Sequence, residues 1–278
     1  MNYRIVDLTP ELANEWIGTM PEFQRKASPV CVAEYAKDMA DGRWISGTGD
    51  AFRFNKQGQM IDGQHRCLAV IESGCTIQAT VIDGLDDEVY LVLDKGRKRT
   101  AADAIGGKNA TVRAAIAKSL IALNNGTPLT SVVSGNTSKK YHPISATEAA
   151  ETAIKKEDVI AQLTDCYMHV KSANNGRFSS SVLTCLAAYA MEITGNLGTF
   201  EAFCRDLAKP VGERPMVCTM AREKASSFNL TKGKSKHAMM FAIYSLAFRY
   251  WLNGETPKII QTSAVTKNVN AIPVKRDW

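Results

Sequence analysis

The chain has 278 residues, of which 45% are hydrophobic and 22% are charged, a composition typical of globular proteins. The sequence holds no apolar run of membrane-spanning length, and its charged, strand-like first residues do not resemble a signal peptide. We therefore expect a cytoplasmic protein without a membrane partner. The net charge of +6 permits contact with nucleic acid without requiring it.

The cysteine and histidine pattern argues against a metal-based fold. The seven cysteines are scattered without a Cys-x-x-Cys pair, and the four histidines are dispersed. Several cysteines stand in apolar surroundings, where a thiol usually serves as a small buried side chain. We predict neither a metal site nor a disulfide framework.

Residues 1–100 alternate short strands with short helices. The pattern predicts an edge strand at 1–7, a helix from Thr9-Pro10 to Trp16, and a helix from Ser28-Pro29 to Gly42. The further elements predicted in this part are a hairpin at 51–61, a helix from Gln64 to Gly74, a strand at 76–82, and helices at 86–93 and 100–106.

After residue 107 the strand pattern stops, and helices are predicted throughout. The helix at 181–194 is apolar nearly all round, so we expect it to be central to this half. The class is α+β, with domains at 1–107 and 108–255 and a polar, basic tail at 256–278. The helices predicted in the second half lie at 111–123, 145–154, 157–171, 181–194, 199–208 and 235–252.

A strand-to-helix junction at Asp62-Gly63 is the strongest functional signal. Gln64, His65 and Arg66 fall in the first helical turn, where unbonded backbone N–H groups and the helix dipole favour an anion, with phosphate as the best candidate. The alternative is an ordinary helix start whose polar residues contact water or their own cap. For His65 alone, a surface or hydrogen-bonded core histidine is the more common role.

Four landmarks of residues 1–105 follow one another in a characteristic order. They are Pro21-x-x-Gln24-Arg25, the helix from Val32 that ends in Gly42-x-Trp44, the box at 62–69, and the segment at 94–100. In this order they resemble the ParB/sulfiredoxin nucleotide-binding domain. The closer resemblance is to the ParB-like "DGQHR" proteins that phages and mobile elements encode, which implies a phage-encoded protein of the host cytoplasm.

The resemblance implies that a nucleoside triphosphate, CTP or ATP, binds at the junction, with Mg²⁺ as an optional cofactor. Gln64 stands where the family carries Glu, and an amide cannot take a proton, so the exchange weakens the case for efficient hydrolysis. Asp62, Gln64 and Asp94 are the catalytic candidates; the alternatives are a helix cap for Asp62 and a surface pair with Lys95 or Arg97 for Asp94. The implied nucleotide-binding residues are Gly63, Gln64, His65, Arg66, Arg25, Arg97 and Arg99.

The leading hypothesis is a DNA-associated protein in which the bound triphosphate controls conformation or assembly, as in a homodimer. The alternatives are a Mg-dependent phosphotransferase or NTPase that uses the same pocket, a less favoured ParB-like nuclease, and a fold that has lost its ligand. Residues 110–171 carry no clear helix-turn-helix pattern, and no cysteine precedes the His-Arg pair, so neither site-specific DNA binding nor sulfinic-acid reduction is expected. Basic residues that would contact DNA, although such runs are more often solvated surface, are Lys95, Lys98, Lys232, Lys234 and Lys236.

Overall fold

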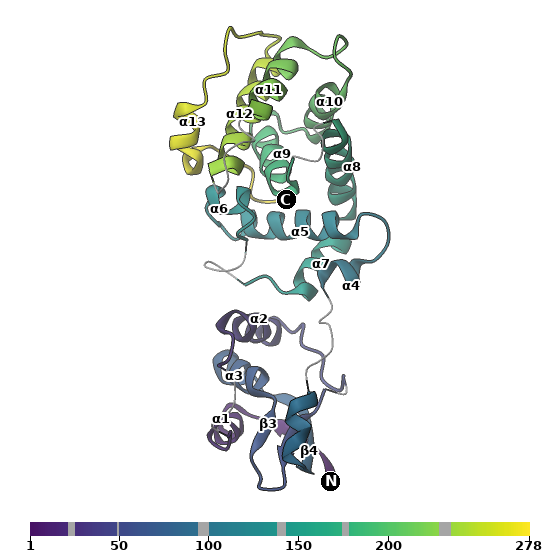
Figure 1. Cartoon of the computed structure of the whole chain (residues 1–278), viewed down its shortest axis with the longest axis vertical. Coiled ribbons are helices and arrows are strands. Elements are labelled where there is room, and N and C mark those ends of the chain that lie inside the picture. The colour runs from purple at the N-terminus through teal and green to yellow at the C-terminus, as the bar shows by residue number, and fades with distance from the viewer. Residues whose placement is uncertain (22–25, 49, 94–99, 138–142, 174–177, 228–234) are drawn as a thin grey trace. The chain divides into compact units, whose positions relative to one another are not determined.

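The computed structural model describes residues 1–21, 26–48, 50–93, 100–137, 143–173, 178–227 and 235–278 (Figure 1). These residues form two compact units. The first unit comprises Met1–Thr100 and Ser145–Glu148, and the second comprises Ala101–Ile144 and Ala149–Trp278. The first contains a mixed sheet with helices and the second is helical, which confirms the predicted α+β class and the mostly helical second half.

The sheet of the first unit consists of β1 (Asn2–Leu8), β2 (Phe52–Asn55), β3 (Met60–Asp62) and β4 (Ile77–Leu85). The strands lie in the order β1-β4-β2-β3. Strand β1 runs antiparallel to β4, and β2 runs parallel to β4 and antiparallel to β3. The predicted edge strand and hairpin are therefore confirmed.

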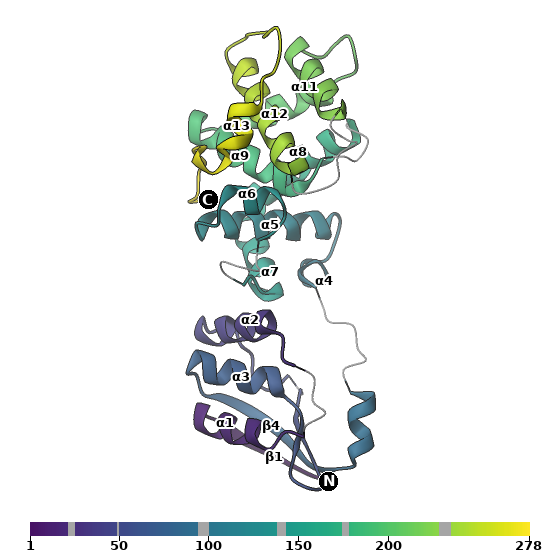
Figure 2. The ribbon, with the colours of Figure 1, turned by 60° about the vertical axis from the view of Figure 1, so that its left-hand side comes forward.

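Three helices lie on one side of this sheet: α1 (Pro10–Gly18), α2 (Pro29–Ala40) and α3 (Gln64–Ser73). Figure 2 shows α3 between α1 and α2, and it contacts both. Trp16 of α1 joins the helices to the sheet, because its ring lies 5.3 Å from that of Phe52 and 5.1 Å from that of Phe54. A short 3-10 helix, η1 (Asp87–Val92), follows β4.

The local sequence explains where these helices begin and end. The side chain of Thr9 accepts a hydrogen bond from the N–H of Leu12, and Pro10 occupies the first helical position of α1. Helix α3 ends at Gly74, which has the left-handed φ of 69° that favours glycine. Both helices therefore follow the boundaries that their caps predict.

The side of the sheet opposite the helices exposes apolar side chains. Along β1, Val6 and Leu8 face the helices, whereas Tyr3 is 64% and Ile5 is 67% exposed. These two residues pair with Ile82 and Thr80 of β4. Alternation along the strand thus leaves an apolar strip on the open face.

Residues Ser145–Glu148 belong to the first unit because side chains of α2 hold them. The hydroxyl of Ser145 donates to the buried carboxylate of Asp38 at 2.8 Å, and Glu148 forms an ion pair with Lys37. Ser145 also accepts a hydrogen bond from the N–H of Glu148, which is the first half of a Ser-x-x-Glu capping box at the start of α7.

The second unit is built around α9 (Ser180–Thr194), as its apolar sequence predicts. Residues 182–190 of α9 are all buried, and the helix contacts α5, α6, α8, α10 and α12. Its other elements are α4 (Ala101–Ile105), α5 (Ala110–Asn124), α6 (Leu129–Val133), α7 (Ala146–Lys155, whose first residues belong to the first unit), α8 (Glu157–Ala173), α10 (Leu197–Ala208), α11 (Met216–Ser227), α12 (Ser235–Leu252), α13 (Ser263–Lys267) and η3 (Val269–Ala271).

Three helices of this unit, α6, α11 and α13, lie outside the ranges in which the sequence pattern predicts helices. Helix α6 interrupts a Gly/Ser/Thr/Asn-rich loop, but Leu129, Val132 and Val133 are buried against the unit. The segment predicted as a polar, basic tail contains α13 and η3, and its residues Ile260 and Val269 are buried. Tertiary burial, rather than intrinsic propensity, stabilises these short helices.

No helix within the described ranges combines the length and apolarity needed to cross a bilayer.

Candidate functional site

Gly63 begins α3 in a backbone conformation that only glycine adopts without strain. Its φ is 122° and its ψ is 0°, and a Cβ atom added there would lie 2.4 Å from Cδ1 of Phe52. The aromatic ring of β2 therefore packs directly against the backbone of the junction. This close packing turns the chain abruptly from β3 into α3.

Helices α2 and α3 run side by side in the same direction, so their N-terminal ends lie together. At the starts, the backbone N–H of Ser28 donates to Nε2 of His65 at 2.9 Å. At the far ends, Ser73 Oγ lies 3.8 Å from Met39 Sδ. Because both dipoles point the same way, their positive ends add at the Ser28–His65 contact.

Neither of these helix starts is capped by the side chain of its own N-cap residue. The Ser28 side chain makes no capping hydrogen bond to α2, and Gly63 has no side chain with which to cap α3. In α3 the first intrahelical bond runs from the N–H of Cys67 to the carbonyl of Gly63 at 3.0 Å. The earlier amides of the turn have no acceptor within the helix, which is the arrangement that binds anions.

Arg66 folds back from α3 and binds the loop before β2. Nη1 donates to the carbonyl of Asp50 at 2.6 Å, and Nη2 donates to the carbonyl of Ala51 at 2.9 Å. The guanidinium carbon lies 4.3 Å from the ring centroid of Phe52, and Nη2 lies 3.5 Å from Oδ2 of Asp62. Arg66 therefore connects the start of α3 to the loop before β2 through two hydrogen bonds, and it also adds a positive charge at the junction.

Asp62 lies between two guanidinium groups. Besides Arg66, Arg53 of β2 donates to its carboxylate in a close ion pair. The three side chains carry two positive charges and one negative charge, which leaves the junction with a net charge of +1. Across the described chain, no group of three or more His, Cys, Asp or Glu side chains is arranged to hold a metal ion.

The structure brings Asp62, Gly63, Gln64, His65 and Arg66 together at the start of α3, with Gly63 buried and the other four partly exposed. The other residues predicted to bind nucleotide, catalyse a reaction or bind DNA, except for Lys236, lie outside the described residues: Arg25, Asp94, Lys95, Arg97, Lys98, Arg99, Lys232 and Lys234.

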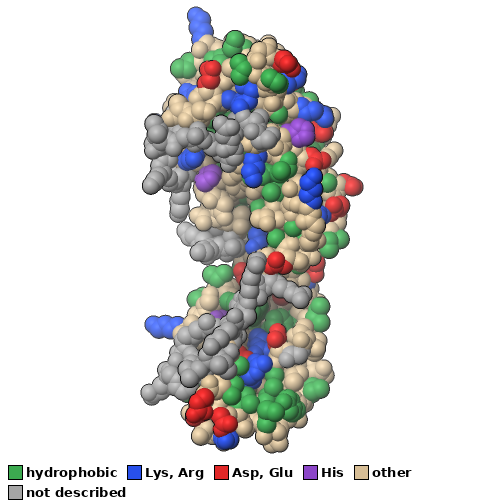
Figure 3. Space-filling view, turned by 45° about the vertical axis from the view of Figure 1, so that its right-hand side comes forward, with side chains coloured by type: hydrophobic (Ala, Val, Ile, Leu, Met, Phe, Trp, Pro, Cys, Tyr) green, Lys and Arg blue, Asp and Glu red, His purple; other side chains and the backbone are tan. Residues whose placement is uncertain are grey.

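Lys236 lies at the second position of α12, in the second unit. The adjacent His237 has a pKa below its ordinary value, because the ring is partly buried and Lys236 is close. On the face of the second unit that Figure 3 shows, basic and acidic side chains are interspersed.

Cys67 follows the His-Arg pair but faces the core. It is fully buried, with Sγ 3.7 Å from Sδ of Met60. Burial raises its pKa to about 12, although the charge of Arg66 opposes this shift. A thiol in this state is not a nucleophile at neutral pH.

Sequence reasoning missed the residues that support the junction from elsewhere in the chain. Ser28 provides the second helix start, and Phe52 packs against Gly63. Arg53 forms an ion pair with Asp62, which also lies beside Arg66. The Ser28-Pro29 pair signals a helix start, but no sequence signal shows that this start lies beside His65. Likewise, alternation along β2 predicts that Phe52 is buried without identifying what it contacts.

Comparison of the chain with protein-family models, with curated proteins and with solved structures finds no match in any of the three. The functional interpretation therefore depends on the geometry of the junction and on the order of the sequence landmarks.

Proposed function

We propose that the first unit binds the phosphate groups of a nucleoside triphosphate at the joint N-terminal ends of α2 and α3. The observation that carries this proposal is the Ser28–His65 contact, which brings together two helix starts whose own N-cap residues provide no side-chain cap. Each helix contributes roughly half a positive charge at its N-terminus. Two such ends suit a polyanion better than a single carboxylate.

The surrounding side chains support the same ligand class. Asp62, Arg53 and Arg66 together add one net positive charge, and Lys26 is exposed near the start of α2. Because Nε2 of His65 accepts the bond from Ser28, the ring proton is on Nδ1 and the imidazole is neutral in this geometry.

We further propose that triphosphate occupancy controls the conformation or assembly of a DNA-associated, ParB-like protein. The support is the order of the four sequence landmarks and the net charge of +6. The exposed side chains of Tyr3 and Ile5 on the open sheet face offer an apolar surface for self-association. Sedimentation with and without nucleotide, on wild type and on Ile5→Lys, tests the role in assembly.

The pairing of Asp62 favours binding over catalysis as the function of this site. A carboxylate that accepts from Arg53 and lies beside Arg66 is already neutralised, so it is a poor base or magnesium ligand. The amide of Gln64 cannot accept a proton either. These contacts therefore support binding rather than Mg-dependent phosphotransfer or NTP hydrolysis at this site.

Calorimetric titration of the full chain with CTP, ATP, GTP and UTP, and with the matching diphosphates and nucleosides, tests the proposal. We expect CTP or ATP to bind, the diphosphate to bind more weakly, and the affinity to fall with salt, because the phosphates provide the attraction. Equal binding of the nucleoside, or no binding of any triphosphate, would contradict it. Inorganic triphosphate, added as competitor, should displace the nucleotide.

A further inference from the structure

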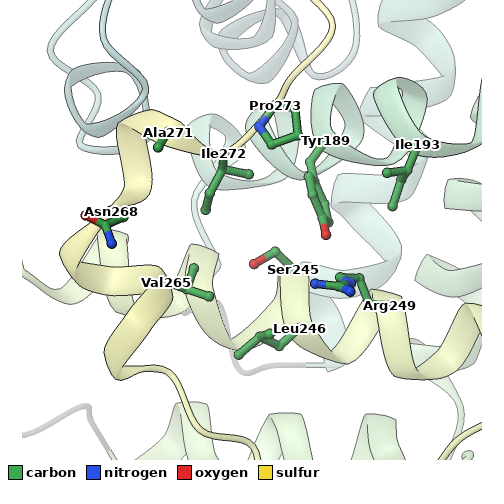
Figure 4. A pocket seen from close by; sticks show the side chains of 10 residues that line it. All are labelled: Tyr189, Ile193, Ser245, Leu246, Arg249, Val265, Asn268, Ala271, Ile272 and Pro273. Carbon is green, nitrogen blue, oxygen red and sulfur yellow. The ribbon is translucent and has the colours of Figure 1, made fainter.

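The second unit contains an open groove between α9, α12 and the C-terminal segment (Figure 4). Its volume is about 460 Å³, within the range of small-molecule sites. Most of its lining is apolar, with Ile193 from α9, Leu246 from α12, and Val265 and Ile272 from the C-terminal segment. Such a groove suits a ligand with a hydrocarbon body.

The C-terminal wall of this groove is held in place by contacts outside it. The N–H of Lys275 donates to the carbonyl of Ala188 at 2.9 Å, and the side chain of Asn270 accepts from the N–H of Thr130 at 2.9 Å. Val269 is also almost fully buried. The wall is therefore anchored to α6 and α9, and the groove is preformed.

The hydroxyl group of Tyr189, whose ring is largely buried, opens into the groove. Tyr189 is only 7% exposed, and its ring packs edge-on against Phe241 and Phe248. Figure 4 shows its hydroxyl pointing into the groove, toward Arg249. The hydroxyl oxygen is not among the buried unpaired polar atoms of the described residues, because it opens into the groove, where it can bond to a ligand.

The guanidinium group of Arg249 lies beside this hydroxyl. Arg249 lines the groove from α12, one turn after Ser245 and Leu246. Among the residues that the structure describes, its guanidinium contacts no carboxylate. Burial raises the pKa of Tyr189 and the charge of Arg249 lowers it, so the two groups interact electrostatically.

We propose that this groove binds a linear amphipathic carboxylate of the medium-chain fatty acid class. The carboxylate accepts hydrogen bonds from Arg249 and from the hydroxyl of Tyr189, and the hydrocarbon chain lies along Leu246, Val265 and Ile272. One unpaired cation matches a single negative charge, and the remaining lining matches an alkyl chain. The inference is independent of the nucleotide site in the first unit.

Titration of the full chain with decanoate and with decanol, followed by calorimetry, tests the assignment. The variants are Arg249→Gln and Tyr189→Phe, and Arg205→Gln is the control because it removes an exposed arginine from α10, outside the groove. We expect decanoate to bind wild type and the control equally, at least about tenfold more weakly to Arg249→Gln, and several-fold more weakly to Tyr189→Phe. Decanol should bind more weakly than decanoate to wild type.

The following results would overturn the proposal. The first is no binding of decanoate to the wild-type chain. The second is equal affinity for decanoate and decanol, or an Arg249→Gln variant that binds decanoate like wild type while keeping the wild-type melting temperature. The third is binding of a short peptide with a C-terminal leucine in place of decanoate, which would assign the groove to a protein partner.

Discussion

The ring of Phe52 packs against the backbone of Gly63, so closely that a Cβ atom at position 63 would lie 2.4 Å from ring atom Cδ1. The same ring lies under the guanidinium group of Arg66, 4.3 Å from its central carbon. A single aromatic side chain of β2 therefore positions both the first residue of the junction and the cation that follows it. Contact with this ring therefore fixes the position of the start of α3.

Gly63→Ala should lower the free energy of unfolding by about 3 kcal/mol, because it combines backbone strain with a clash against Phe52. Gly74→Ala is the matched control: its φ of 69° is also left-handed, but a Cβ atom there meets nothing within 4 Å. We expect it to cost about 1 kcal/mol. Urea unfolding of both variants measures the difference, and equal losses would show that Phe52 does not restrict position 63.

Arg66→Ala should destabilise the first unit by about 2 kcal/mol, because the carbonyls of Asp50 and Ala51 lose their donor. Arg66→Lys should recover little, since an ammonium group cannot reproduce the planar fork. Arg4→Ala serves as control, because its pair with Asp83 is half exposed and contributes at most about 1 kcal/mol. Urea unfolding of these variants measures the change in the free energy of unfolding, and nucleotide titration of Arg66→Ala is compared with that result.

The buried thiol of Cys67 should make the stability fall in alkaline solution. In the unfolded chain the thiol ionises near its ordinary pKa of 9.0, whereas burial raises the pKa in the folded protein to about 12. The stability that the neutral thiol contributes is therefore complete below pH 9. As the pH rises toward 12, the free energy of unfolding falls by about 1.4 kcal/mol per pH unit.

Urea unfolding of wild type and Cys67→Ala between pH 8 and pH 10.5 measures this slope, which the variant should reduce. Val70→Ala removes buried volume from the same helix without removing an ionisable group, so it should keep the wild-type slope. A Cys67→Ala variant with the wild-type slope would show that the thiol is not protected by burial.

Gln64→Glu should raise the rate of nucleotide hydrolysis, if the site binds a triphosphate as proposed. A carboxylate at this position can accept a proton from an attacking water, which the amide cannot, and general-base catalysis contributes roughly a hundredfold or more. A negative charge in the first turn of α3 is compatible with the helix dipole but repels the phosphates, so the rates are compared at saturating nucleotide. Phosphate release with magnesium measures the rate, and turnover unchanged by the substitution would place Gln64 away from the reacting phosphate.

Local sequence signals predicted the junction well because glycines and caps act locally. Gly63 and Gly74 both have positive φ, and they delimit α3 where the sequence predicts it. The side chain of Thr9, which caps the first turn of α1, likewise marks where that helix begins. These features depend on a few neighbouring residues and need no tertiary information.

The remaining features depend on contacts between distant residues. Glu148 belongs to a capping-box pattern, yet its carboxylate pairs with Lys37 of α2 rather than with the local backbone. The parallel alignment of α2 and α3 follows from the way both pack beside the sheet, and no local pattern encodes helix direction. For the same reason, neither the contact of Ser28 with His65 nor the preformed groove beside Arg249 was predictable from the sequence.

The most direct measurement compares triphosphate binding by Ser28→Asp and Ser28→Asn. Asp and Asn are as suitable as Ser at the N-cap of a helix, so both variants should fold and keep the melting temperature, but only Asp adds a negative charge at the paired helix starts. Asn196→Asp, which adds the same charge at the exposed start of α10 in the second unit, is the control.

We predict that Ser28→Asp weakens binding of CTP or ATP at least about tenfold in calorimetry, by repulsion between its carboxylate and the phosphates. Ser28→Asn and Asn196→Asp should bind like wild type. Equal affinities for the Asp and Asn variants at position 28 would contradict a phosphate site at the joint ends of α2 and α3.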